Sequence, residues 1–201
     1  MLEGPLVFVD VDTQRDFLEP DGALYVSRAA EIAANLARLT AFARQAGISV
    51  LATACAHTID DIEEIAEFGP HCMVGTPGQR RIAATAWDAG DVLGPADKFS
   101  GTIRPHLTIE KRAFDVFSNP EAARVVAVYN ETKPTFVVYG VYTDYCVKAA
   151  VFGLLDRECK VAVVVDAIRA IDFDHEIDIL SEFSRRGALL VATDAVCSDG
   201  S

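Results

Sequence analysis

Short runs of apolar residues alternate along the chain with longer segments of helical periodicity. Residues 6–9 are apolar at every position, which is typical of a strand that is covered on both faces. Between residues 29 and 45, apolar residues recur at the spacing of an amphipathic helix, and Gly47 supplies a stop. The pattern predicts strands at 6–9, 48–52, 107–109, 135–139, 161–165 and 188–192, and helices at 29–45, from about 118–121, at 144–157 and at 175–186.

Strands that alternate with helices indicate an α/β fold, with a six-stranded parallel sheet and helices on both faces. In such sheets, functional groups gather beyond the carboxyl ends of the strands. Residues 58–99 break the alternation and are rich in Gly and Pro. We expect one domain over residues 1–201, in which 58–99 form an insertion of loops and short helices over the active edge.

Composition narrows the classes of function. The chain has 201 residues, of which 51% are hydrophobic, and a net charge of −12, which argues against a nucleic-acid partner. The N-terminus does not resemble a signal peptide, and no apolar run approaches the roughly 20 residues that span a bilayer, so no membrane association is expected. Five cysteines without framework spacing are expected to be reduced, in a cytoplasmic protein.

The strongest local signal is Gly-Val-Tyr-Thr-Asp-Tyr-Cys-Val at residues 140–147. A buried strand ends here, Thr143 is placed to cap a helix, and Cys146 falls in its first turn. Free N–H groups and the helix dipole at that place favour a thiolate and can hold an oxyanion. The alternative is a cysteine that packs as a small hydrophobe. Packing is the interpretation for Cys72, Cys159 and Cys197, which lack this setting.

Two further strand ends carry charged residues. Asp12 follows the first strand, where partial burial raises a carboxyl pKa towards that of a useful base, although Asp is also common as a turn cap. Lys111 follows the strand at 107–109, either as a solvated charge or as a group that stabilises a thiolate and a carboxylate. Residues 8–13 also resemble the nucleophile motif of haloacid-dehalogenase-like phosphatases, with Asp10 as nucleophile and Mg²⁺ bound.

A fourth group of residues offers metal ligands. Cys55, His57, Glu64 and His71 lie close together along the chain, and all four are competent ligands for Zn²⁺ or a similar ion. Their spacing fits no compact zinc finger, so the residues alone leave metal binding open.

Three segments together resemble the isochorismatase-like cysteine hydrolases, and within them the nicotinamidases. The segments are Asp-Thr-Gln-Arg-Asp-Phe at 12–17, Lys-Arg-Ala-Phe-Asp-Val-Phe at 111–117 and the motif at 140–147, in the order of the family. The resemblance implies a Rossmann-like three-layer fold, with Asp12 as base, Lys111 beside it and Cys146 as nucleophile. It also implies a cis peptide at 141–142 that turns the N–H groups of Tyr142 and Cys146 towards the substrate oxygen. The phosphatase interpretation leaves Cys146 without a role.

The resemblance extends to the metal. Pro-His-Cys at 70–72 is similar to a segment that carries a histidine ligand, and His57 and Glu64 match further ligand positions. Cys55 stands where the family has Asp, and its thiolate is a softer ligand. The implied cofactor is a divalent metal, Zn²⁺ first, held by Cys55, His57, Glu64 and His71.

The implied reaction is hydrolysis of a small-molecule amide through a thioester, first of all nicotinamide to nicotinate and ammonia. Phe17, Phe68, Val141 and Tyr142 are the expected substrate contacts, although the two phenylalanines also fit ordinary core packing. Alternatives are another small amide, a carbamoyl compound or a ureide on the same catalytic residues, or a non-catalytic thiol- or metal-binding protein on this scaffold. Relatives of this kind lead us to expect a homo-oligomer.

Overall fold

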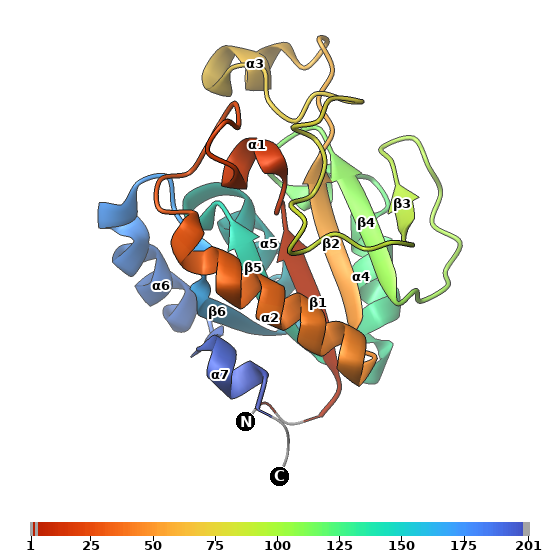
Figure 1. Cartoon of the computed structure of the whole chain (residues 1–201). Coiled ribbons are helices and arrows are strands. Elements are labelled where there is room, and N and C mark those ends of the chain that lie inside the picture. Colours follow the sequence, from red (N-terminus) through yellow and green to blue (C-terminus); the bar gives the residue numbers. More distant parts are fainter. Residues whose placement is uncertain (1, 3, 199–201) are drawn as a thin grey trace.

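The computed structural model describes residues 2 and 4–198 and contains a central parallel sheet between two layers of helices (Figure 1). The sheet has seven strands in the order β3-β4-β2-β1-β5-β6-β7. The strands are β1 (Leu6–Val11), β2 (Ser49–Cys55), β3 (Asp91–Leu93), β4 (His106–Lys111), β5 (Thr135–Val141), β6 (Lys160–Arg169) and β7 (Leu189–Val191). All paired strands are parallel, as the alternating pattern predicts.

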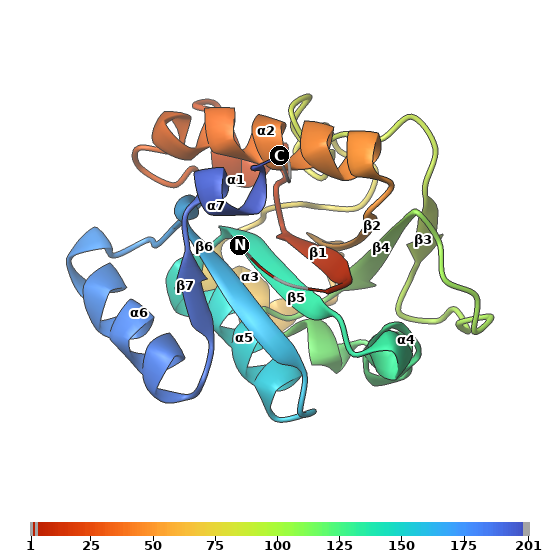
Figure 2. The same ribbon diagram turned by 90° about the horizontal axis from the view of Figure 1, so that it is seen from below.

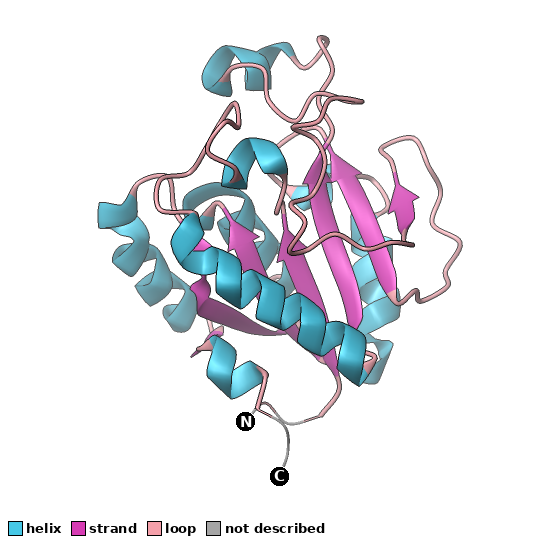
Figure 3. Cartoon of the chain, viewed as in Figure 1, coloured by secondary structure: helices cyan, strands magenta, loops and turns pink. Residues whose placement is uncertain are grey.

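Helices cover both faces of this sheet, which Figure 2 shows from below and Figure 3 by type of element. Helices α1, α2 and α7 lie on one face, and α4, α5 and α6 lie on the other. The helices are α1 (Arg15–Leu18), α2 (Ala30–Ala46), α3 (Ile62–Phe68), α4 (Ala122–Tyr129), α5 (Lys148–Leu155), α6 (Glu176–Arg185) and α7 (Thr193–Val196). Gly47 ends α2 in the left-handed conformation with φ of 65°, as expected for a helix stop.

Alternation along β1 supplies both cores. Val7, Val9 and Val11 face the core beneath α4, α5 and α6. Phe8 faces the opposite core beneath α2 and packs edge-on against Tyr139 of β5, at 5.9 Å between ring centroids. Because successive residues of a strand point to opposite faces, a central strand that is buried on both sides is expected to be apolar throughout. In β1, Asp10 is the buried exception.

The structure differs from the predicted elements at the segment 58–99 and at the turn that carries Cys146. The sheet gains β3, a seventh strand of three residues inside the segment 58–99, too short to show a period. That segment also contains α3, one of the short helices that were expected there. Residues Thr143–Val147 form a single π-helical turn before α5, and its N-cap residue is Tyr142. Thr143 is therefore not the cap; its hydroxyl donates to Glu176 Oε2 at 3.2 Å instead.

Gly140 allows β5 to approach β1 closely at the active edge. It pairs with Val11, has φ of 119°, and an added Cβ would lie 2.0 Å from the carbonyl oxygen of Val11. No side chain fits at this position, so glycine is required. The next peptide bond, Val141–Tyr142, is cis, as the family resemblance implies.

Within the described part of the chain, no helix is both long and apolar enough to cross a membrane.

Candidate active site

The carboxyl ends of β1, β4 and β5 bring Asp12, Lys111 and Cys146 to the same edge of the sheet. Asp12 follows β1, Lys111 is the last residue of β4, and Cys146 lies in the π-helical turn after β5. The strand order reverses between β1 and β5, and a crevice at such a point is where parallel sheets bind ligands. The tertiary structure thus joins three residues that lie far apart in the sequence.

Asp12 and Lys111 form a buried ion pair. Lys111 Nζ lies 2.9 Å from Asp12 Oδ2, and Thr53 Oγ1 donates to Asp12 Oδ1 at 2.5 Å. Burial alone would lower the pKa of Lys111, but the attraction of the Asp12 carboxylate, with further contributions from the neighbouring Cys146 and Cys55 side chains, outweighs burial and holds the pKa well above its ordinary value. Lys111 is therefore a permanent cation in this site.

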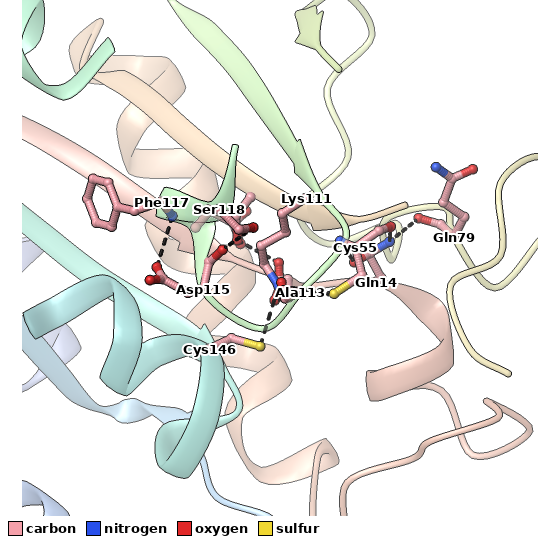
Figure 4. A network of polar contacts seen from close by, with 12 residues as sticks. Gln14, Cys55, Gln79, Lys111, Ala113, Asp115, Phe117, Ser118 and Cys146 are labelled. Carbon is pink, nitrogen blue, oxygen red and sulfur yellow. Dashed lines mark hydrogen bonds and ion pairs between the residues drawn. The ribbon is translucent and has the colours of Figure 1, made fainter. Parts of the chain in front are cut away.

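Cys146 lies beside this pair, with its sulfur 3.5 Å from Lys111 Nζ (Figure 4). A hydrogen bond with the side chain of Cys55 and burial raise its pKa well above the ordinary value, and the attraction of Lys111 does not offset them. The resting group is therefore the thiol, and the thiolate expected from the helix N-terminus alone is not favoured. Attack by this sulfur requires a base that removes its proton.

Cys55 also lies beside Asp12, Lys111 and Cys146. It is the direct partner of Lys111 in the β2–β4 register, and Lys111 Nζ donates to its sulfur at 3.1 Å. The Cys55 sulfur also lies 3.8 Å from Asp12 Oδ2. Two further hydrogen bonds join the Cys55 main chain to the Gln14 amide, one from Cys55 N to Gln14 Oε1 and one from Gln14 Nε2 to Cys55 O. The sequence did not indicate this contact with the catalytic residues.

Cys55, His57 and His71 fit a metal ion. One ligand atom from each lies within 4.8 Å of the others. Both ring nitrogens of His57 are buried and have no hydrogen-bond partner among the described residues. Burial, together with His71 and Lys111, lowers its pKa to about 4, so the ring is neutral as a metal ligand must be. His71 donates from Nδ1 to Gly69 O at 2.9 Å, which leaves its Nε2 lone pair free.

Glu64, the fourth predicted ligand, is not part of that cluster. It lies on α3, and its carboxylate accepts a hydrogen bond from the main chain of Phe114. Burial raises its pKa above the ordinary value, against the attraction of Lys111. Its side chain instead lines the pocket in front of Cys146.

A pocket opens onto Cys146 and the metal-ligand candidates. Phe17, Phe68 and Tyr142 line it, as expected of substrate contacts, whereas the Val141 side chain is buried in the core and does not. Phe17 packs against Tyr142 at 5.1 Å between ring centroids and against His71 at 5.5 Å. The walls are thus largely aromatic, and the ligand atoms of Cys55, His57 and His71 lie together at one end of the pocket lining.

Other pocket residues were not predicted. Leu24, Phe114, Tyr145 and Ile171 complete the walls. Phe114 and Tyr145 lie inside the motifs around Lys111 and Cys146, so the motifs are a signal for them. Leu24 and Ile171 come from separate loops and carry no local signal in the sequence.

The model of the isochorismatase domain family matches residues 6–195. The chain belongs to the isochorismatase family. No curated protein sequence matches it. The family membership agrees with the parallel α/β fold and with a cysteine hydrolase, which the resemblance of the three motifs also implied.

Solved structures of similar fold include amidases. N-carbamoylsarcosine amidase from Thermoplasma acidophilum is 23% identical, with a TM-score of 0.76 over 95% of this chain and 98% of that one. Nicotinamidase from Bacillus subtilis is 19% identical, with a TM-score of 0.78 over 94% and 99%. Pyrazinamidase of Pyrococcus horikoshii, in complex with zinc, is 25% identical, with a TM-score of 0.74 over 94% and 99%.

The phosphatase alternative is not supported. This isochorismatase-family chain holds Asp10 away from the pocket, fully buried and 2.9 Å from Arg81 in an ion pair. Thr13 also donates to its carboxylate, at 2.8 Å. Asp10 therefore has a structural role beneath the active edge. The non-catalytic alternative also lacks support, because the hydrolase family model covers most of the chain.

Proposed function

We propose that this isochorismatase-family hydrolase cleaves the carbon–nitrogen bond of a small aromatic amide, nicotinamide first, through a thioester on Cys146. The observation that carries the proposal is the buried Lys111 ammonium, which contacts both Asp12 and Cys146, and the Cys146 side of this contact lines an aromatic pocket. Aromatic walls favour a flat ring, and the polar end suits a substrate with a ring nitrogen and an amide.

In the first half of the reaction, Asp12 takes the proton of the Cys146 thiol, and the sulfur attacks the amide carbonyl. The main-chain N–H groups of Tyr142 and Cys146 hold the oxyanion. Asp12 then returns the proton to the leaving nitrogen, so ammonia departs and an acyl thioester remains on Cys146. Lys111 holds the Asp12 carboxylate in place and stabilises the sulfur as negative charge develops.

In the second half, Asp12 removes a proton from water, whose oxygen attacks the thioester carbonyl. The carbon–sulfur bond breaks, the acid is released, and the Cys146 sulfur recovers its proton. The same carboxylate serves both halves, which is consistent with its position beside Lys111 and Thr53.

A divalent metal, Zn²⁺ first, would be held by Cys55, His57 and His71. Three protein ligands leave an open position, as in metal sites that bind substrate. When bound, the ion supplies a Lewis acid that orients a lone pair of the substrate, such as that of a ring nitrogen. Glu64 faces the same pocket and is available to bind a polar substituent of the substrate.

Ammonia release from nicotinamide tests the proposal, with zinc-supplemented protein and a Cys146→Ala variant. Cys159→Ala is a matched control, because Cys159 is also buried but does not line the pocket. We expect release from the wild-type chain and from Cys159→Ala, and none from Cys146→Ala. Folded wild-type protein whose Cys146 reacts with iodoacetamide but releases no ammonia would rule out nicotinamide. The search would then turn to carbamoyl compounds and ureides.

A further inference from the structure

Two cysteine sulfurs share one ammonium group in the active site. Lys111 Nζ donates to Cys55 at 3.1 Å and to Cys146 at 3.5 Å, and Figure 4 shows both sulfurs directed towards it. The two sulfurs thus contact one atom, and a disulfide requires them to close to about 2.05 Å from each other.

The three other cysteines are placed differently. Cys72 is buried with its sulfur 4.0 Å from Gly78 O, and Cys159 has its sulfur 3.8 Å from Arg157 O. Of the cysteines, all of which lie in the described part of the chain, Cys55 and Cys146 alone line the pocket in front of the nucleophile. A small oxidant that enters the pocket therefore meets this pair first.

We propose that Cys55 and Cys146 form a disulfide bond when the protein meets a peroxide. The Cys146 sulfur attacks a peroxide oxygen; the O–O bond breaks, one water leaves, and Cys146 becomes a sulfenic acid. The Cys55 sulfur then attacks that sulfur; the S–S bond forms and the S–O bond breaks, releasing a second water. The two electrons that reduce the peroxide come from the sulfur pair.

The bond removes the nucleophile reversibly and protects it from irreversible oxidation. A sulfenic acid without a neighbouring thiol continues to sulfinic acid, which thiol reductants do not reverse. The disulfide requires a cysteine at position 55 as well as the nucleophile at position 146. It depends on the sulfur pair alone and not on the identity of the substrate.

The test is hydrogen peroxide treatment of the full chain, as purified and after incubation with a chelator, because a metal at Cys55 competes for its sulfur. Free thiols are then blocked with iodoacetamide, and the protein is cut after glutamate for mass spectrometry. Glu63 and Glu64 separate Cys55 from Cys72, and Glu158 separates Cys146 from Cys159. We expect a linked pair of peptides containing Cys55 and Cys146, which dithiothreitol separates. Blocked Cys55 beside sulfinic Cys146 in both samples would overturn the proposal.

Variants sharpen the result. In Cys55→Ser we expect peroxide to convert Cys146 to sulfinic acid, with no recovery of its thiol in dithiothreitol. Cys159→Ser is the matched control and should form the same disulfide as the wild-type chain. Reversible oxidation of Cys146 in folded Cys55→Ser would show another partner and contradict the pairing. The wild-type peptide map decides by itself if a variant does not fold.

Discussion

The carboxylate of Asp12 and the ammonium of Lys111 lie 2.9 Å apart, and their side chains are 0% and 1% exposed. Removing two charges from water is costly, so each depends on the other for its stability in the interior. Asp12 also adopts a left-handed backbone conformation, with φ of 49°, directly after β1. Asp and Asn tolerate that conformation better than other residues with a side chain.

Replacing Asp12 by Asn removes the base that the buried Cys146 thiol requires. We expect kcat for amide hydrolysis to fall by about 10²–10⁴-fold. Asp10→Asn is the control: it lies outside the pocket and pairs with Arg81, so we expect it to lower the melting temperature but to retain kcat. We would measure kcat of both variants by steady-state kinetics at a temperature below both of their melting temperatures. Equal loss of kcat in the two variants would contradict the role of Asp12.

Lys111→Met leaves the Asp12 carboxylate buried without its cation. We expect a loss of about 3–5 kcal/mol in the free energy of unfolding, measured by urea denaturation. The double variant Asp12→Asn/Lys111→Met should lose less than the sum of the single variants, because it carries no unpaired buried charge. Simple additivity would mean that the two groups do not stabilise each other.

Gly140→Ala places a methyl group against the carbonyl oxygen of Val11, a main-chain atom within the sheet. We expect the free energy of unfolding to fall by at least about 3 kcal/mol. Gly47→Ala is the matched control, since its φ is also positive but no atom of the described residues lies within 4 Å of the added Cβ. That variant should cost about 1 kcal/mol, and similar losses in both would contradict the close approach of β5 to β1.

His106 should make stability depend on pH. Burial, together with Arg81 and Arg44, lowers its pKa to about 4 from 6.5, so the unfolded chain binds a proton here that the folded chain refuses. The contribution of His106 to the free energy of unfolding is therefore fully present above pH 6.5 and is lost as the pH falls towards 4. On going from pH 7 to pH 5, His106 alone should lower the free energy of unfolding by about 2 kcal/mol. Urea denaturation at both pH values should show a smaller difference in His106→Gln; an unchanged difference would be contrary evidence.

Metal content should separate the candidate ligands. Because Cys55, His57 and His71 form the cluster and Glu64 lies outside it, His57→Ala and His71→Ala should lose zinc on dialysis, while Glu64→Gln keeps it. Elemental analysis gives zinc per chain for each variant. Loss of zinc in Glu64→Gln to the same degree would place Glu64 among the ligands.

The sequence by itself determined the layered fold and the catalytic candidates. Central strands buried on both faces must be apolar, so residues of β1 and β5 were visible as continuous apolar runs. Parallel strands end at one edge, so Asp12, Lys111 and Cys146, each after a strand, were expected to meet. The three-residue β3 was missed, because two of its residues are exposed and it has no measurable period.

Only the tertiary structure decided which catalytic residues Cys55 contacts. Its contact with Lys111 depends on the β2–β4 register, in which the two residues are direct partners, and no local pattern encodes that register. The raised pKa of Cys146 also depends on Cys55, through a side-chain hydrogen bond, together with burial. Leu24 and Ile171 reach the pocket from distant loops, whose positions depend on what they pack against. Local periodicity thus specifies the elements, whereas distances between side chains from different strands and loops arise only when the sheet is assembled.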